Sequence, residues 1–276
     1  PAGEAGFNIA RVVAILSGLP DVPGVTVNRY CSSSLQTIRM AAHAIKAGEG
    51  DVFIAAGVEA VSRYGAGASD TAPNPVFKEA GARTRSRAEG GAPTWEPPAG
   101  LPDIYIAMGQ TAENVAQAED VGRAEQDEFA VLSQNRAEES LNNGFWDAEI
   151  TPVTTPDGEV TRDDGIRPGT TLEKVSGLNP VFRPDGTVTA GNACPLNDGA
   201  AAVVVMSDTK AAELGVTPLA RIVATGVSGL SPEIMGLGPV EATKRALANA
   251  GMSINDIDLV EINEAFAAQV VPSYQE

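Results

Sequence analysis

The sequence predicts an α/β fold, in which buried strands alternate with helices. Two nearly all-apolar stretches, 51–57 and 200–206, have the composition of strands that are covered on both faces. An apolar stretch at 25–29 predicts a further short strand. Between it and 51–57, residues 31–47 repeat apolar side chains at three- and four-residue steps, which is typical of an amphipathic helix. Together the first two strands and this helix predict a βαβ-like unit.

The helix over 31–47 carries signals at both ends. Ser32, Ser33 and Ser34 are suited to capping its start, and Gly48 is suited to ending it. Leu35, Ile38, Ala42 and Ile45 form its apolar face.

The middle of the chain changes character. Residues 65–104 are rich in Gly, Pro, Ala and Arg and have little periodicity, which indicates an excursion made of loops. Helical patterns follow at 111–119 and 123–142, and 150–188 is again rich in turn residues.

The last part of the chain alternates once more. The remaining predicted elements are a strand at 219–226, a helix at 240–249 that ends before Gly251, a strand at 257–262 and a helix after Asn263-Glu264-Ala265-Phe266. Cys31 and Asn263 are thus both predicted at strand-to-helix corners, where open α/β sheets place their chemistry.

Composition excludes several classes of protein. A net charge of −17 and a pI near 4.4 argue against nucleic acid or an anionic membrane as partner, because both attract clustered Lys and Arg. No apolar run approaches the roughly 20 residues that cross a bilayer. With two cysteines and no pattern of a signal peptide, we expect a cytoplasmic location, and we expect both ends to be cuts through a longer protein.

Cys31 is the strongest candidate nucleophile. Its predicted place at the start of a helix puts the sulfur near unpaired backbone N–H groups and the positive end of the helix dipole, which favour thiolate over thiol. The alternative is a small buried cysteine at an element junction.

Four segments together resemble the thiolases, the acyl-CoA:acetyl-CoA C-acyltransferases. They are Val27-Asn28-Arg29-Tyr30-Cys31-Ser32-Ser33-Ser34-Leu35-Gln36, Ala56-Gly57-Val58-Glu59-Ala60-Val61-Ser62-Arg63, residues 187–201 (Thr187-Val188-Thr189-Ala190-Gly191-Asn192 and onward), and Glu261-Ile262-Asn263-Glu264-Ala265-Phe266-Ala267. Each segment alone is a weak signal, but all four occur in the order and at the spacing of that family.

The resemblance implies a layered α-β-α-β-α sandwich of two similar mixed-sheet halves with an inserted loop domain, incomplete here. By it, 1–63 and 186–213 form the N-terminal half, 64–185 the loop domain that binds CoA and the acyl chain, and 214–276 the start of the C-terminal half. It also implies an internal fragment of the family's chain and a homodimer or homotetramer.

The implied activity is cleavage of a 3-oxoacyl-CoA with CoA, or condensation of acetyl-CoA, through a cysteine acyl-enzyme in ping-pong fashion. Cysteine suits this chemistry because exchange between thioesters is nearly isoenergetic. Cys31 takes the acylated position, and Asn263 matches an asparagine that holds a water stabilising the thioester oxyanion; such a donor can contribute ~3 kcal/mol. The alternative for Asn263 is a helix N-cap, and Glu264 stays unassigned between site and structure.

Three further residues match family positions that contact CoA or the acyl chain. Arg167 matches an arginine at the nucleotide end of CoA, with a solvated surface arginine as the alternative. Cys194 replaces a serine that touches the pantetheine arm, and small buried packing is its alternative. Met108 matches a methionine of the acyl pocket or is core filler, and Ala107 before it, in place of a frequent His, hints at a longer or bulkier acyl chain.

The remaining candidates are weaker. The basic cluster Arg83, Arg85 and Arg87 either attracts CoA phosphates or is a solvated loop. His43, the only histidine, lies twelve residues after Cys31 along a predicted helix, too far to serve as its base. One His and two distant Cys predict no metal site, and no permanently bound cofactor is expected, CoA being a substrate.

The family's base lies in a His-Pro-x-Gly segment and its second cysteine in a Cys-x-Gly segment, and the 276 residues contain neither. We therefore expect negligible thiolysis from these residues alone and activity from the full-length protein. The alternatives are a ketosynthase-type condensing enzyme, which Asn263-Glu264-Ala265-Phe266 disfavours, and a non-catalytic acyl-CoA-binding relative, which Cys31 disfavours.

Overall fold

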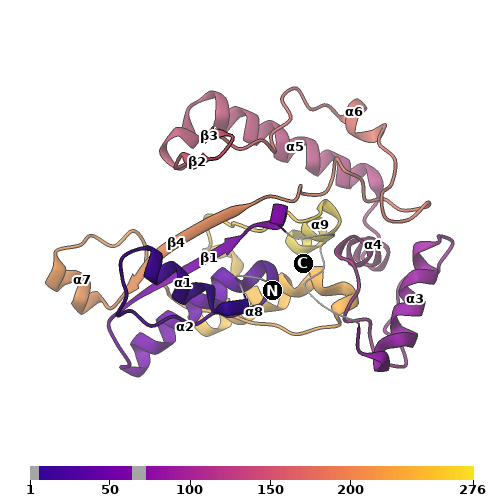
Figure 1. The fold of residues 1–276 in the computed structure, drawn as a ribbon. Coiled ribbons are helices and arrows are strands. Elements are labelled where there is room, and N and C mark those ends of the chain that lie inside the picture. The colour runs from indigo at the N-terminus through magenta and orange to yellow at the C-terminus, as the bar shows by residue number, and fades with distance from the viewer. Residues whose placement is uncertain (1–5, 64–72) are drawn as a thin grey trace. The chain divides into compact units, whose positions relative to one another are not determined.

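A computed structural model describes residues 6–63 and 73–276 (Figure 1). The chain divides into two compact units, one of residues 1–72 with 196–225 and one of residues 73–195 with 226–276. Each unit is described by itself.

A two-stranded antiparallel sheet forms the centre of the first unit. Strand β1 (Val52–Glu59) pairs with β4 (Gly199–Met206) along its whole length, and helix α2 (Ser33–Ala47) packs on the pair. The core between them is built from Ala41, Ala55 and Val205. The strands predicted at 51–57 and 200–206 and the helix at 31–47 are therefore confirmed in position, the helix beginning with a 3₁₀ turn over residues 30–32. The expectation that both faces of these strands are covered is wrong, because each strand has one buried residue and most of the others are exposed.

The two ends of α2 are held in different ways. Gly48 ends the helix in the left-handed conformation, at φ 76°, as predicted. At the start, the side chain of the N-cap residue Ser32 makes no capping bond, and the Ser33 hydroxyl instead accepts a hydrogen bond from the backbone N–H of Arg29 at 2.8 Å. The serine run thus holds the turn before the helix.

The predicted strand at 25–29 is wrong, and so is the βαβ-like unit that depended on it. This segment has no strand partner among the described residues, and Val25 is 65% exposed. It contacts α1 (Ile9–Leu16), a helix that the sequence patterns did not predict. The Thr26 hydroxyl accepts a hydrogen bond from the backbone N–H of Ala10 and donates one to the Asn8 side chain. Apolar composition does not itself supply the neighbouring strand that a ladder requires.

In the second unit, α4 (Met108–Ala118) is the central helix, and its residues Gly109 to Ala116 are buried. It packs against α9 (Ala267–Gln275), and α5 (Arg123–Asn142) also contacts α9. Both predicted helices of the middle region are confirmed, α5 with the predicted bounds. Further helices are α3 (Lys78–Ala88), α6 (Leu172–Ser176) and α8 (Gly238–Ala250), and α7 (Asp208–Leu214) belongs to the first unit.

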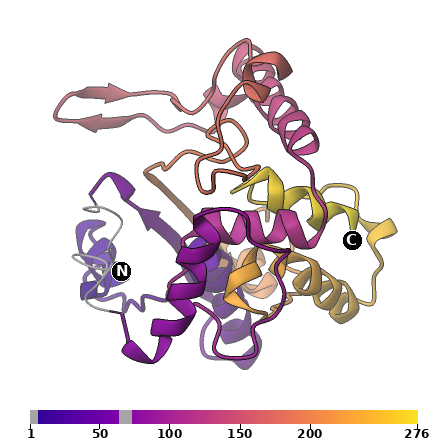
Figure 2. The same cartoon turned by 90° about the vertical axis from the view of Figure 1, so that its right-hand side faces the viewer.

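The turn-rich residues after α5 include a short hairpin. Its strands β2 (Val153–Thr155) and β3 (Gly158–Val160) pair antiparallel, and Figure 2 shows them as an arm that projects beyond the helices.

Three further predictions, for residues 65–104, 219–226 and 257–262, are corrected. The region 65–104 is not all loop, because α3 lies within it; the residues 64–72 fall outside the described part. A helix this polar has no apolar stripe, which is the signal that sequence patterns offer. The stretches 219–226 and 257–262 form no strand in the structure as described, and Leu219 and Leu259 are fully or largely exposed.

Gly57 in β1 allows the start of α2 to approach the sheet. A Cβ at this position would lie 1.9 Å from Ser34 Oγ and 3.2 Å from Ser34 Cβ. We expect Gly57→Ala to lower the free energy of unfolding by about 1–3 kcal/mol, measured by urea denaturation. The matched control is Gly199→Ala, in the partner strand, where nothing lies within 4 Å of the added Cβ. Equal effects of the two substitutions would contradict this close approach.

Candidate functional site

Cys31 lies in the 3₁₀ turn of residues 30–32 that leads directly into α2, and its side chain is exposed. The exposure excludes the alternative of a buried packing cysteine. The predicted strand before it is missing, so the corner runs from irregular chain into a helix. The placement at a helix start nonetheless agrees with the expected position of the thiol.

The backbone around Cys31 is held in an unusual conformation. Tyr30 has φ 49°, in the left-handed region that a bulky side chain rarely adopts. Three short hydrogen bonds maintain it: the Tyr30 N–H donates to Asn28 Oδ1 at 2.8 Å, its carbonyl accepts from Ser33 Oγ at 2.7 Å, and Arg29 N–H donates to the same hydroxyl. Such strain persists where the surrounding contacts over-determine it.

Asn263 lies in the second unit, in an exposed irregular segment four residues before α9. The N-cap of α9 is Phe266, so the alternative interpretation of Asn263 as a helix cap is wrong. Its neighbour Glu264 accepts a hydrogen bond from Ser133 Oγ of α5 at 2.5 Å. This gives the Glu264 carboxylate a structural contact.

The structure brings the segment of Cys194 beside that of Asn263. The N–H of Cys194 donates to the Ala265 carbonyl at 3.0 Å, Ala193 forms an antiparallel bridge with Phe266, and the N–H of Ala267 donates to the Asn192 carbonyl at 2.9 Å. Cys194 is exposed, which contradicts buried packing as its role. Two of the four family-like segments therefore share a hydrogen-bonded edge.

Glu113 anchors this edge to α4, and sequence patterns did not identify it. Its side chain is 2% exposed, and its two oxygens accept from the N–H groups of Thr187 and Val188 at 3.0–3.1 Å and from the Thr187 hydroxyl at 3.3 Å. Gly186 makes room for it, because a Cβ there would lie 2.2 Å from Glu113 Oε1. A carboxylate that accepts several N–H groups offsets the cost of its burial.

A second buried network anchors the edge to α5. Asn192 is 3% exposed; its amide N–H₂ donates to Asp127 Oδ1 at 2.9 Å and to the Thr187 carbonyl at 3.0 Å. Asp127, 1% exposed, also pairs with Arg123 Nε at 2.7 Å. The loop from Thr187 to Asn192 is thus fixed by one carboxylate on each of two helices.

Met108 begins α4 and is 45% exposed, so it is not simply core filler. The next residue, Gly109, faces Phe182: a Cβ there would lie 2.2 Å from the ring. Phe182 in turn packs edge-to-face on Phe266, with ring centroids 6.2 Å apart. The start of α4 therefore lies in the same cluster as the Cys194 and Asn263 segments.

Arg167 does not join this cluster. It is exposed on the loop after β3, its backbone N–H donates to Gln134 of α5 at 2.9 Å, and its guanidinium donates to the carbonyls of Asp164 and Ile166. Cys31 belongs to the other unit. Of the predicted site residues, Met108, Cys194 and Asn263 come from segments in contact.

The weaker candidates are also placed. His43 is exposed within α2, as predicted, and Arg83, Arg85 and Arg87 lie on α3 rather than in a loop.

Among residues 6–63 and 73–276, no group of three or more His, Cys, Asp or Glu could hold a metal ion. In the same part of the chain, no helix combines the length and apolar character needed to cross a membrane.

Substitution of Asn192 tests the buried network. In Asn192→Asp, an oxygen replaces the donor that faces Asp127, so we expect a loss of roughly 3–5 kcal/mol in the free energy of unfolding, measured by urea denaturation at neutral pH. The control is Asn143→Asp, the same chemical change at an exposed residue whose oxygen accepts from Phe145 N–H, a bond that aspartate keeps. Its effect should stay below about 1 kcal/mol. Similar losses in both variants would contradict the network.

Asp198, in the first unit, offers a pH test. Hydrogen bonds from the Ser62 hydroxyl and the Ser62 N–H lower its pKa. Because the folded-state pKa lies below the unfolded one, Asp198 adds stability above its unfolded pKa and loses that stability as pH falls through the folded value. Ser62→Ala should therefore raise the pKa of Asp198 towards its ordinary value, measured by carboxyl-carbon NMR titration. An unchanged titration would show that the hydroxyl has no such effect.

Comparison with known proteins agrees with this geometry. The family model of the thiolase N-terminal domain matches residues 1–209, and that of the C-terminal domain matches residues 216–276. The 3-oxoadipyl-CoA/3-oxo-5,6-dehydrosuberyl-CoA thiolase of Escherichia coli is 44% identical over 98% of this chain and 68% of that protein. The acetyl-CoA acetyltransferase of Cupriavidus necator is 46% identical over 99% and 69%.

Solved structures give the same family. The peroxisomal thiolase of Saccharomyces cerevisiae, described as dimeric, superposes with a TM-score of 0.84 at 35% identity, over 96% of this chain and 64% of that one. The chain thus spans about two thirds of the length of these relatives, and it has their α/β fold. It belongs to the thiolase family of acyl-CoA acyltransferases.

Proposed function

We propose that the full-length protein is a thiolase that cleaves 3-oxoacyl-CoA with CoA, or condenses acetyl-CoA, through an acyl-enzyme on Cys31. The observation that carries the proposal is the exposed Cys31 thiol at the start of α2, on a turn whose backbone is held by Asn28 and Ser33. A nucleophile needs access to the carbonyl carbon and a fixed direction of approach. The exposure supports the first need and the held turn the second.

The chemistry divides into two transfers. In the first, the Cys31 thiol gives up its proton and the thiolate attacks the 3-oxo carbon, the bond between carbons 2 and 3 breaks, and the departing acetyl-CoA enolate takes up a proton. In the second, the CoA thiol gives up its proton and its sulfur attacks the acyl-Cys31 carbonyl. The bond from the Cys31 sulfur to the acyl carbon breaks, which releases the shortened acyl-CoA and restores the Cys31 thiolate. Both transfers pass through an oxyanion, which an amide donor stabilises; we assign this role to Asn263, acting through a water.

The substrate is held, in this proposal, by residues on separate elements. Met108 at the start of α4 and Cys194 beside Ala265 contact the acyl and pantetheine parts, and the shared edge described above supports their grouping with Asn263. Arg167 contacts the nucleotide end of CoA; its guanidinium is exposed on its loop. Ala107 leaves room for a longer or bulkier acyl chain, since it has no side chain beyond Cβ.

We further propose that the full-length protein acts in lipid breakdown, that it is located in the cytoplasm, and that it forms a homodimer or homotetramer. The Escherichia coli relative is named as a thiolase of acyl-CoA compounds, and the yeast structure is described as dimeric. The three-part division into 1–63 with 186–213, 64–185 and 214–276 is likewise proposed, with the loop domain as the CoA-binding part.

Kinetics of the full-length protein test the role of Cys31. With acetoacetyl-CoA and CoA, Cys31→Ser should lower kcat by at least about 10³-fold, because a serine hydroxyl is a far weaker nucleophile than a thiolate. The measurement is the rate of acetyl-CoA formation at saturating substrate.

Cys194→Ser supplies the contrast in that assay. As a contact to the pantetheine arm, Cys194 should affect the KM for CoA, by less than about tenfold, and leave kcat within about twofold. A Cys31→Ser enzyme with normal turnover, or a loss of kcat confined to Cys194→Ser, would overturn the assignment.

A further inference from the structure

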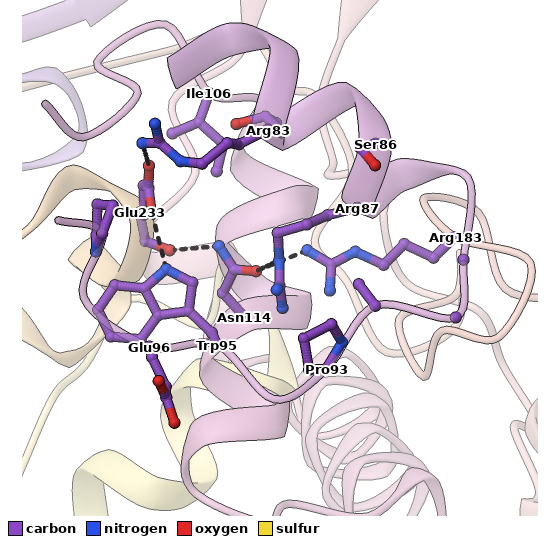
Figure 3. Close-up of a pocket in the computed structure, with 15 residues that line it drawn as sticks. Arg83, Ser86, Arg87, Pro93, Trp95, Glu96, Ile106, Asn114, Arg183 and Glu233 are labelled. Carbon is purple, nitrogen blue, oxygen red and sulfur yellow. Dashed lines mark hydrogen bonds and ion pairs between the residues drawn. The ribbon is translucent and has the colours of Figure 1, made fainter. Parts of the chain in front are cut away.

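A pocket of about 410 Å³ lies in the second unit, apart from the residues assigned to acyl transfer. Its walls come from α3, the loop after it, one face of α4 and residues Arg183 and Glu233 (Figure 3). Three arginines line it, Arg83, Arg87 and Arg183. This gathering of positive charge stands out in a chain of net charge −17.

One of the three arginines is neutralised within the pocket. Arg83 Nη2 lies 3.3 Å from Glu233 Oε1. The Glu233 carboxylate has its remaining contacts with the N–H of Asp103 at 2.8 Å and the indole N–H of Trp95 at 2.8 Å. Both oxygens of the Glu233 carboxylate therefore already have partners on the side of the pocket where Arg83 lies.

Arg87 and Arg183 are not neutralised in this way. Within the described residues, neither guanidinium has a carboxylate oxygen within 4.0 Å. They donate to neutral acceptors instead: Arg183 donates to the Gln110 side-chain oxygen at 2.8 Å and to the Gln110 carbonyl at 3.2 Å, and two further acceptors are shared by both arginines. The Asn114 amide oxygen accepts from Arg87 Nε at 3.1 Å and from Arg183 Nη2 at 2.7 Å, and the Gln117 oxygen accepts from Arg87 Nη2 at 2.6 Å and Arg183 Nη1 at 3.2 Å.

The nearby carboxylates are committed elsewhere. Asp185 accepts from the Gly91 N–H at 2.6 Å, Asp103 accepts from Thr84 Oγ1 and Tyr105 N–H, and Glu113 accepts from the N–H groups of Thr187 and Val188. Glu96 is exposed and points away from both guanidinium groups in Figure 3.

Arg183 shows the electrostatic cost of the arrangement. Arg183 is 3% exposed, and burial together with the neighbouring Arg87 lowers its pKa to about 10, with the carboxylates of Glu113 and Asp185 acting in the opposite direction. Both arginines keep their charge at neutral pH, so two like charges sit together in a partly buried wall. An anion between them would relieve this repulsion.

We propose that this pocket binds a dianion of the phosphomonoester class between the guanidinium groups of Arg87 and Arg183. Guanidinium forks match the oxygens of phosphate, and Arg87 Nη1 makes no hydrogen bond with the described residues, so it can donate to the ligand. The phosphate belongs either to a free ion or to a larger molecule, for which the apolar wall of Pro93, Trp95 and Ile106 has room. The site does not include Arg167.

The experiment is a calorimetric titration of the 276-residue protein with inorganic phosphate, with chloride at matched ionic strength as the reference. Saturable binding is expected. Arg87→Gln should weaken it by about tenfold or more, because a charge-assisted contact is lost. Arg85→Gln is the matched control: it removes the same charge from the same helix outside the pocket, so the affinity should change less than about twofold.

Competition measurements distinguish a free phosphate from the phosphate of a larger molecule, and a second variant distinguishes loss of binding from loss of folding. Competition by CoA but not by dephospho-CoA would assign the site to the 3′-phosphate of CoA, and no competition by either would assign it to a free phosphate. Arg87→Lys, which keeps the charge, should bind more tightly than Arg87→Gln, and circular dichroism checks that both fold. Absence of saturable phosphate binding by the unmodified protein, or equal losses in Arg87→Gln and Arg85→Gln, would overturn the proposal whether or not Cys31 carries an acyl group.

Discussion

The buried carboxylate of Glu113 is the contact on which the arrangement of the second unit depends. It sits on a helix whose middle is buried, and it takes two successive backbone N–H groups, Thr187 and Val188, that have left regular secondary structure. A buried N–H without a partner is costly, so the loop and the helix must come together as a pair. Gly186 is required by the same contact, since any side chain there would meet the carboxylate.

The consequences of this contact reach the candidate site. Once 187–192 is fixed, Asn192 can offer its amide to Asp127 and its carbonyl to the first N–H of α9. Ala193 and Cys194 then pair with Ala265 and Phe266, which lie two and three residues beyond Asn263. The proposed oxyanion donor and the proposed pantetheine contact are thus positioned by the same buried polar network, which favours a fixed geometry over a mobile loop.

Sequence patterns predicted the elements whose physics is local. The β1 and β4 runs are continuous and apolar, and α2 and α5 have clear periodicity or clear ends, such as Gly48. The stretches 25–29 and 257–262 contain apolar residues in alternation with polar ones, as strands do, but lack a neighbouring strand in the described structure, which composition does not reveal. Helix α3 was missed for the opposite reason, since its polar side chains are held by contacts to α4 such as Arg87 with Asn114.

In the candidate site, too, residues with a local signal in the sequence were predictable and residues with distant partners were not. Cys31 was predictable because its place before a helix is a local property, and Cys194 and Asn263 because their segments match a family. Glu113 was not, because its partners lie 74 and 75 residues further along the chain.

The proposed chemistry requires that Cys31 carries the acyl group. The direct measurement is peptide mass spectrometry of the full-length protein after incubation with acetyl-CoA and acid quenching. We expect one acetyl group on the peptide that contains Cys31 and none on that peptide in Cys31→Ala. An acetyl group on Cys194 instead, or no modified peptide at either cysteine while thiolysis proceeds, would contradict it.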